Sequence, residues 1–263
     1  MKRVLKKWRY GAMFLRNGCA IALILLLLVH FLSQPRWLFS LATKIRPGAI
    51  YAVSLPAVSS SEYEDAIPEK VVALTIDDGP SPATADILAV INRHGAKATF
   101  FNISSNLAGR EDVVRQVVAS GHELGNHLTA DEPSIRMSSE VFEADLKTAE
   151  AALLPFLAAG SLQRSSLKWL RPGMGFYNAE MVATAERHGY QVVLGSNFPY
   201  DTHIPSSQFA STFILSTVEP GDIIVLHDGE GRGDRTIETL EKILPELKEK
   251  GYTVTTVSGL HDF

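Results

Sequence analysis

The sequence predicts an α/β protein with a mostly parallel sheet, helices on its outside and a site at one edge of the sheet. Short apolar, β-branched runs alternate with helical patterns over residues 70–263. Ionisable residues follow five of the seven runs directly. Strands separated by helices are typical of parallel sheets. The periodicity leaves open whether this sheet closes into a barrel.

Seven runs have the length and composition of strands. In chain order they read VVALTI, KATFFNI, HELGNH, LKWLR, QVVLGS, IIVLH and YTVTTV. The first run ends in two adjacent carboxylates, Asp77 and Asp78. Two like charges at one strand end repel each other and resist burial. The pair therefore belongs either to an exposed turn or to a metal or acid–base site.

The stretches between these runs have signals for helix starts and ends. After the first run, Ser81 is expected to cap a helix that has Pro82 in its first turn and Gly95 at its end. The next helix, REDVVRQVVASG, begins with acidic residues. The other helical patterns are SSEVFEADLKTAEAALLPFL, NAEMVATAERHG, SSQFASTFILSTV and RTIETLEKILPELKEKG. Each helix can return the chain to the start of the next parallel strand.

Composition and charge exclude several function classes. The chain of 263 residues has one cysteine, Cys19, which excludes an internal disulfide framework and a cysteine-based zinc site. Residues 1–61 contain nine basic residues and no acidic one, which leaves 16 basic and 29 acidic residues beyond them. That acidic remainder, with a net charge of about −13, argues against a nucleic-acid partner.

The basic N-terminus surrounds an apolar run, CAIALILLLLVHFL, at Cys19–Leu32. Its 14 residues are short for a membrane span and fit the core of a signal peptide as well. Ser40–Ala42 can serve as a small-residue cleavage site, but the long basic segment before the run favours an uncleaved anchor. Both interpretations place the rest of the chain outside the cytoplasm, because six basic residues precede the run.

The chain is therefore expected to divide into three parts. Residues 1–42 would form the basic N-terminus with its membrane anchor or signal segment, and residues 43–69 a linker. Residues 70–263 would form the folded domain. The expected location is a single-pass membrane protein with a cytoplasmic N-terminus and an extracytoplasmic domain, or a secreted protein if the segment is cleaved.

Chemistry in parallel α/β folds gathers at the carboxyl ends of the strands. Each ionisable residue found there has an ordinary structural explanation when it is taken alone. Together they predict a common site, because these strand ends meet at one edge of the sheet. The residues are Asp77, Asp78, His127, Asp131, Arg171, Asp201 and His227.

These segments resemble, in order, the motifs of the polysaccharide deacetylase family (carbohydrate esterase 4), also called the NodB-homology domain. The matching segments are TIDDGP, HLTAD, RPGMG, FPYDT and VLHDG, and the resemblance covers about residues 70–260. It implies a distorted (β/α) barrel with about seven strands. It also implies metal-dependent removal of acetyl groups from an N-acetylated polysaccharide or oligosaccharide.

The resemblance also implies a role for each catalytic residue. Asp77 resembles the base that takes a proton from the attacking water, and Arg171 the group that orients it. His227 resembles the acid that protonates the leaving amine, and Asp201 the carboxylate that keeps it charged. The backbone N–H of Met174 would help to stabilise the oxyanion, the negatively charged oxygen that forms when water attacks the acetyl carbonyl.

By the same resemblance, Asp78, His127 and Asp131 would hold a divalent metal ion. Zinc is the expected ion, with manganese, cobalt or nickel as alternatives. Its charge would let both adjacent carboxylates stay ionised. Asp131 stands where the family has a second histidine, and an aspartate can also bind a divalent ion.

Other departures from the motifs affect the sugar pocket. Gly173 and Met174 replace a proline and a tyrosine, while Phe198 and Thr202 replace an aspartate and a tryptophan. Three functions therefore stay open. The first is deacetylation of a glycan, the second hydrolysis of another acyl amide or acetyl ester on a glycan, and the third glycan binding by a catalytically weakened domain.

Overall fold

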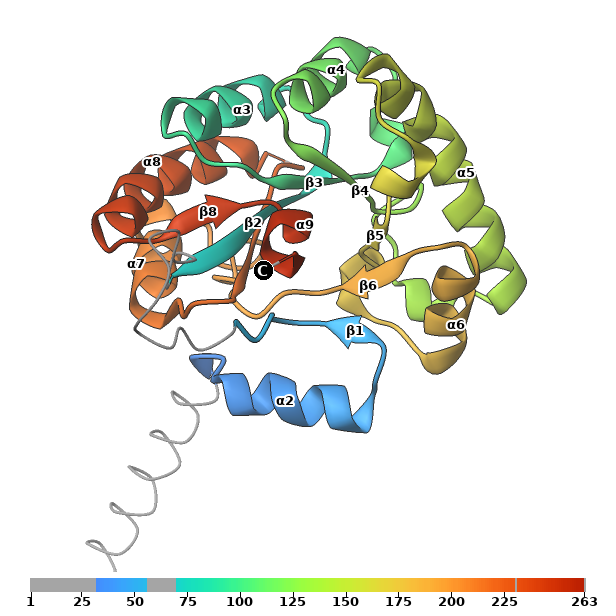
Figure 1. The fold of residues 1–263 in the computed structure, drawn as a ribbon, viewed down its shortest axis with the longest axis horizontal. Helices are drawn as coiled ribbons and strands as arrows, with labels where there is room; N and C mark the ends of the chain where they lie inside the picture. Colours follow the sequence, from blue (N-terminus) through green and yellow to red (C-terminus); the bar gives the residue numbers. More distant parts are fainter. Residues whose placement is uncertain (1–31, 56–69, 230, 263) are drawn as a thin grey trace, which may run out of the picture.

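The computed structural model describes residues 32–55, 70–229 and 231–262 (Figure 1). Its strands form one curled, eight-stranded sheet in the order β1-β6-β5-β4-β3-β2-β7, with β8 paired to β2. Every strand pair is parallel. The strands are β1 (Ala49–Ile50), β2 (Val71–Gly79), β3 (Thr99–Asn102), β4 (Glu123–Asn126), β5 (Trp169–Leu170), β6 (Gln191–Val193), β7 (Ile223–His227) and β8 (Thr253–Thr255).

The predicted fold class is confirmed. The seven expected strands appear in order as β2 to β8. Two isolated bridges, Asn197 to Ile224 and Ala52 to Asp222, join the β1–β6 edge to β7. The two edges of the sheet are joined by these isolated bridges and not by a continuous ladder of hydrogen bonds. The sheet therefore forms a distorted barrel.

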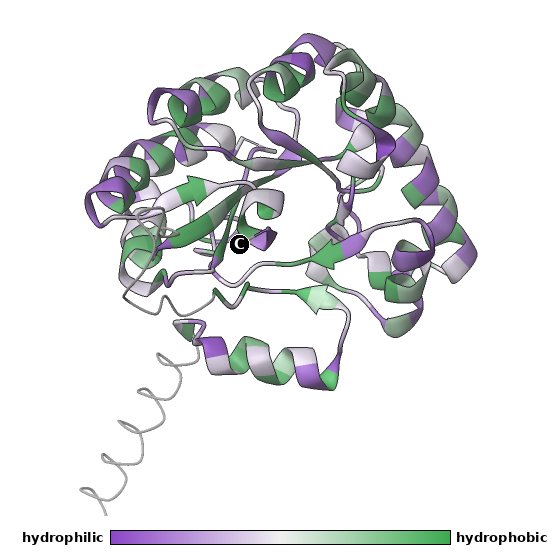
Figure 2. Cartoon of the chain, viewed as in Figure 1, coloured by the Kyte–Doolittle hydropathy of each residue, from purple (hydrophilic) through white to green (hydrophobic). Residues whose placement is uncertain are grey.

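Most helices surround the barrel, with hydrophilic residues on their outer faces (Figures 1 and 2). These outer helices are α3 (Thr84–Arg93), α4 (Glu111–Ala119), α5 (Ser139–Ala159), α6 (Ala179–Arg187), α7 (Ser207–Thr217) and α8 (Gly233–Glu249). The short helix α9 (Val257–His261) lies inside the ring of strands. Its Val257 and Leu260 are fully buried and pack in one cluster with Trp169 of β5. Helix α9 thus fills part of the barrel interior.

Strand β2 shows how the barrel directs residues into the site. Val72, Leu74 and Ile76 belong to the core under the helices, whereas Val71 and Ala73 belong to the inner cluster with α9. Successive side chains of a strand point to opposite faces. Residues 75 and 77 therefore continue the inner face, beyond the apolar filling and toward the carboxyl end of the strand.

The N-terminal part of the described chain contributes to the fold. Helix α2 (Arg36–Ile45) lies outside the barrel, and β1 follows it at the edge of the sheet (Figure 1). Ala49 and Ile50 pair with Val192 and Val193 of β6. The expected linker, residues 43–69, thus includes a strand of the sheet, because an apolar pair there completes the exposed edge of β6. Its residues 56–69 lie outside the described residues.

The expected anchor, Cys19–Leu32, lies outside the described residues except for Leu32. Among residues 32–55, 70–229 and 231–262, no helix is long and apolar enough to span a bilayer. The division into anchor, linker and catalytic domain stays a prediction.

Candidate active site

Asp77 lies at the inner face of β2, where Arg171 binds it. One guanidinium nitrogen, Nη1, donates to Asp77 Oδ1 at 2.5 Å and to Thr75 Oγ1 at 2.7 Å. Nε of Arg171 donates to the carbonyl of Val193 at 3.0 Å. The guanidinium also stacks over the Phe101 ring at 4.2 Å from its centroid. Asp77 and Arg171 are both buried, so the guanidinium fixes the position of the Asp77 carboxylate.

Asp78 enters the same site although it follows Asp77 directly. The ladder between β2 and β3 shifts register between Asp77 and Gly79, and Asp78 adopts a left-handed backbone with φ of 67°. This irregularity breaks the alternation that would point its side chain to the opposite face. Aspartate accepts the left-handed region more readily than most residues. The strand end thus delivers two adjacent carboxylates to one place.

His127 and Arg232 bind different oxygens of the Asp78 carboxylate. Oδ1 lies 3.2 Å from Nε2 of His127, and Oδ2 lies 2.6 Å from Nη2 of Arg232. Burial raises the pKa of Asp78, but the His127 hydrogen bond and the nearby positive charges outweigh burial and hold it at about 2. A Cβ at Gly229 would lie only 2.7 Å from Cβ of Asp78, so glycine is needed there.

His127 and Asp131 complete a set of residues that fits a divalent metal ion. One ligand atom from each of Asp78, His127 and Asp131 lies within 4.8 Å of the others. His127 Nδ1 donates to the carbonyl of Arg171 at 2.6 Å, which leaves Nε2 toward Asp78. Metal-binding histidines use this second-shell bond to fix their tautomer. Burial lowers the pKa of His127, but Asp78 and Asp77 raise it overall, and a cation would displace that proton.

His227 and Asp201 form the other half of the site. His227 Nδ1 lies 3.0 and 3.1 Å from the Asp201 oxygens, and its backbone N–H donates to Asp201 Oδ2 at 3.0 Å. Burial lowers the pKa of His227, but Asp201 outweighs burial and raises it to about 9. His227 is the partner of Asp77 in the β2–β7 ladder. The proposed acid and base therefore project from neighbouring strands at the same level.

Met174 lies in the short 3-10 helix Gly173–Gly175 that follows β5. It has a left-handed backbone with φ of 57° and is exposed. The N–H of Gly173 donates to Ser134 Oγ at 2.7 Å, and a Cβ at Gly173 would meet the carbonyl of Glu132. The loop with Met174 thus touches the loop that follows Asp131. The oxyanion role of the Met174 N–H stays a prediction.

Two further residues lie at the site that were not among those predicted from the sequence, Asp228 and Arg232. Arg232 binds Asp78, as described above. Asp228 is buried, donates its N–H to the carbonyl of Asp77 at 2.8 Å, and accepts from Ser81 Oγ at 2.5 Å and from Thr84 Oγ1. Burial raises the pKa of Asp228, and the hydrogen bonds from Ser81 and Thr84, which lower it, do not offset this effect. Asp228 directly follows His227 in the sequence, and this position was the one feature that could have predicted its place at the site.

The expected cap at Ser81 is wrong. Helix α3 begins at Thr84 with Ala83 as its N-cap residue, which has no side-chain capping bond. The Ser81 hydroxyl instead accepts from the N–H of Ala83 and donates to Asp228. The buried carboxylate competes for this hydroxyl, so Ser81 joins the turn after β2 to the end of β7.

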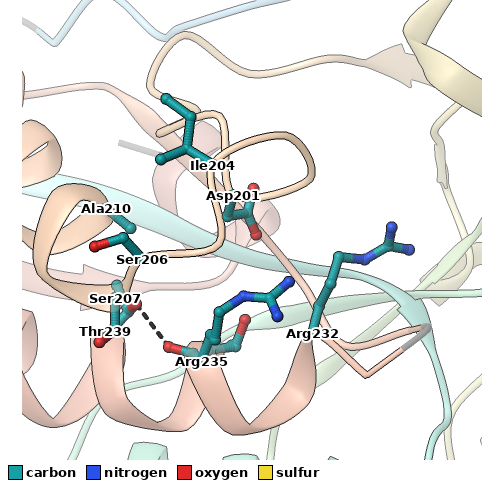
Figure 3. A pocket seen from close by; sticks show the side chains of 9 residues that line it. Asp201, Ile204, Ser206, Ser207, Ala210, Arg232, Arg235 and Thr239 are labelled. Carbon is teal, nitrogen blue, oxygen red and sulfur yellow. Dashed lines mark hydrogen bonds between the residues drawn. The ribbon is translucent and has the colours of Figure 1, made fainter.

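Two depressions lie beside these residues. A cleft of about 410 Å³ has Asp78, Asp131 and Arg232 in its wall, so it is wide enough to admit a ligand to the proposed metal ligands. Figure 3 shows a smaller pocket lined by Asp201, Arg232 and Arg235, in which the guanidinium of Arg235 extends toward Asp201 and that of Arg232 points away from it. Arg232 lines both, and it therefore separates the metal-ligand side from the Asp201 side.

Fold and site define a class of α/β barrel proteins with a carboxylate and an imidazole paired at the barrel mouth. The family model for polysaccharide deacetylases matches residues 64–193. A peptidoglycan-N-acetylglucosamine deacetylase of Bacillus cereus is 35% identical over 195 residues, which cover 73% of this chain and 88% of the relative. The chain therefore belongs to the polysaccharide deacetylase family (carbohydrate esterase 4, NodB-homology domain).

Other relatives agree with this assignment. A chitooligosaccharide deacetylase of Bradyrhizobium is 28% identical over 211 residues, covering 76% of this chain and 94% of the relative. A solved structure, the carbohydrate esterase 4 domain of a multidomain xylanase from the hindgut metagenome of Trinervitermes trinervoides, superposes with a TM-score of 0.66. It is 31% identical and covers 74% of this chain and 90% of that domain.

Proposed function

We propose that the protein is a divalent-metal-dependent hydrolase that removes N-acetyl groups from an N-acetylated glycan outside the cytoplasm. The observation that carries the proposal is the pairing of Asp77 with His227 across the β2–β7 ladder, next to the Asp78, His127 and Asp131 set. Names of relatives, which include peptidoglycan and chitooligosaccharide deacetylases, support this glycan class.

Each residue has a task that its contacts support. A divalent ion held by Asp78, His127 and Asp131 would polarise the acetyl carbonyl as a Lewis acid. Asp77, held in position by Arg171, accepts a proton as water attacks the carbonyl carbon. His227, kept protonated by Asp201, donates a proton to the nitrogen as the C–N bond breaks. The products are acetate and a free amine on the sugar.

The deciding experiment measures acetate released from acetylated chito-oligosaccharides and from peptidoglycan fragments. The protein is assayed as purified, after chelation, and after zinc, manganese, cobalt or nickel is restored. Release that is lost on chelation and recovered with metal supports the proposal. Glycan binding without acetate release would support the weakened-domain alternative, and release only from O-acetylated substrates would support an esterase.

We also propose that residues 1–42 hold the protein at a membrane, with the catalytic domain on the extracytoplasmic side. The basis is the apolar run 19–32 and the six basic residues before it. Fractionation of cells that express the full chain tests this proposal. Full-length protein in the membrane fraction is expected, and recovery of uncleaved protein in the soluble fraction would contradict it.

A further inference from the structure

The loop between β6 and α7 carries Asp201 to His227. At its start, the N–H of Val225 donates to the carbonyl of Asn197 at 2.9 Å, which ties the loop to β7. At Asp201, the carboxylate accepts the N–H of His227. Residues 198–200 bridge these two attachments. The position of Asp201 therefore depends on what holds this short stretch.

Gln34, from the start of the described chain, binds the main chain of Phe198 in this stretch. Its Nε2 donates to the carbonyl of Phe198 at 2.7 Å, and its Oε1 accepts the N–H of Phe198 at 3.0 Å. A side-chain amide thus satisfies both polar groups of one residue, as a neighbouring strand would. Phe198 lies three positions before Asp201.

The burial and the backbone conformation of Gln34 indicate that its hydrogen bonds to Phe198 hold it in place. The residue is only 8% exposed, and it has a left-handed backbone with φ of 55°. The left-handed region is unfavourable for glutamine, and burial of an amide is costly unless it is hydrogen-bonded. A residue held in this way needs surrounding contacts that outweigh both costs. The two bonds to Phe198 supply such contacts.

Neighbouring residues attach the same segment to the domain. Arg36 forms ion pairs with Glu219 at 3.1 Å and with buried Asp222 at 3.3 Å. The hydroxyl of Tyr200 donates to the carbonyl of Leu32 at 3.0 Å. The segment 32–36 is therefore attached both to the loop and next to the start of β7, so it can restrain the loop.

We propose that Gln34 is a positioning residue for the Asp201–His227 pair, acting through the main chain of Phe198. Asp201 must meet both the backbone N–H and the ring of His227. A loop released at Phe198 would let Asp201 shift, and small misplacements of a catalytic group lower the rate steeply. This inference rests on the proposed function, because it assigns His227 the part of the acid.

The test uses the full-length protein and acetate release from acetylated chito-oligosaccharides. Gln34→Ala removes both bonds and is expected to lower kcat roughly tenfold with little change in KM. Gln34→Gly removes the same bonds but accepts the left-handed backbone. It should show the same loss of kcat with a higher Tm than the alanine variant, which separates catalysis from stability. Thr43→Ala in α2, whose exposed hydroxyl bonds its own helix, is the matched control and should leave kcat unchanged.

A second measurement does not depend on activity. Hydrogen exchange of the amides at 198–201 should be faster in both Gln34 variants than in the wild type and the Thr43→Ala control. The proposal is overturned if the folded Gln34 variants keep kcat within about twofold of the wild type, or if exchange in the loop is unchanged. If the wild-type protein releases no acetate, the proposed function fails, whereas the exchange measurement still decides whether Gln34 holds the loop.

Discussion

The two halves of the site are held by different means. The base half comprises Asp77, Asp78, His127 and Arg171, which lie at or next to the ends of β2, β4 and β5. In the acid half, His227 ends β7, but Asp201 lies on a loop beyond β6. The residues of the base half lie at or next to strand ends of the sheet, whereas Asp201 of the acid half lies on a loop whose main chain is bound by the side chain of Gln34.

This difference has consequences for how each half should respond to change. A residue at a strand end is held by parallel neighbours on both sides, so its variants should alter chemistry more than placement. A residue on a loop is held by fewer contacts, and it can be displaced by changes far from the site. Variants of the base half should therefore abolish a step, while variants around the acid half should shift rates and pH dependence.

The largest effect is expected for Asp77→Asn. The amide has nearly the same shape but cannot accept the proton, so turnover should fall to background while the fold and the metal affinity are kept. Acetate release and calorimetric metal titration of the same sample test this. Asp78→Asn serves as the comparison, because it should weaken metal binding itself. Substantial activity of Asp77→Asn would show that another group is the base.

His227→Ala is expected to lower kcat by about 10²–10⁴-fold, the usual contribution of a positioned acid or base. Substrate affinity should change less, because the proposed role of the imidazole is to protonate the leaving nitrogen. Steady-state kinetics with one acetylated oligosaccharide separate kcat from KM. An unchanged kcat would assign the proton donation to a different residue.

The pH dependence of the acid half gives a smaller but more specific effect. The pKa of His227 is about 9 because Asp201 outweighs burial, so the protonated acid is lost as pH rises through about 9. The rate should fall there in the wild type. Asp201→Asn removes the negative charge, lowers the pKa of His227, and should move the falling limb of the pH–rate profile to lower pH.

The free energy of unfolding should also depend on the protonation of His227. The folded pKa of His227 lies above its ordinary value of 6.5. Its protonation therefore stabilises the fold fully below about pH 6.5, and this contribution is lost as pH approaches about 9. The difference in unfolding free energy between wild type and Asp201→Asn should be largest at low pH and shrink across that range. A difference that is constant with pH would contradict this coupling.

Sequence reasoning succeeded where the position of a residue follows from the strand pattern. Asp77 and His227 end apolar runs, and parallel pairing then brings them together. Sequence reasoning failed where tertiary contacts determine the hydrogen-bond partner of a side chain. Ser81 was expected to cap a helix, but the buried carboxylate of Asp228 takes its hydroxyl. Gln34 lies 164 positions before Phe198, within the residues 1–42 that were expected to contain the membrane anchor or signal segment, and no local pattern predicts that contact.

The smallest effect concerns Asp131, which lies in the loop after β4 and is the exposed member of the proposed metal-ligand set. With Asp78 and His127 it would give a divalent ion two carboxylates and one imidazole. Two negative charges offset the charge of the ion, which makes it a weaker Lewis acid, and oxygen ligands favour harder ions such as manganese over zinc. The rate optimum should accordingly lie at higher pH than with two histidines and one carboxylate.

Two substitutions at this position measure its contribution. Asp131→His should tighten zinc binding and move the rising limb of the pH–rate profile to lower pH, because imidazole suits zinc and adds no negative charge. Asp131→Ala should weaken metal binding by about tenfold or more, since loss of even an outer-shell partner costs that much. Calorimetric titration with zinc and with manganese distinguishes affinity from selectivity. If Asp131→Ala leaves both affinities unchanged, Asp131 is not a ligand, and a metal ion would have to be held by Asp78 and His127 with other partners.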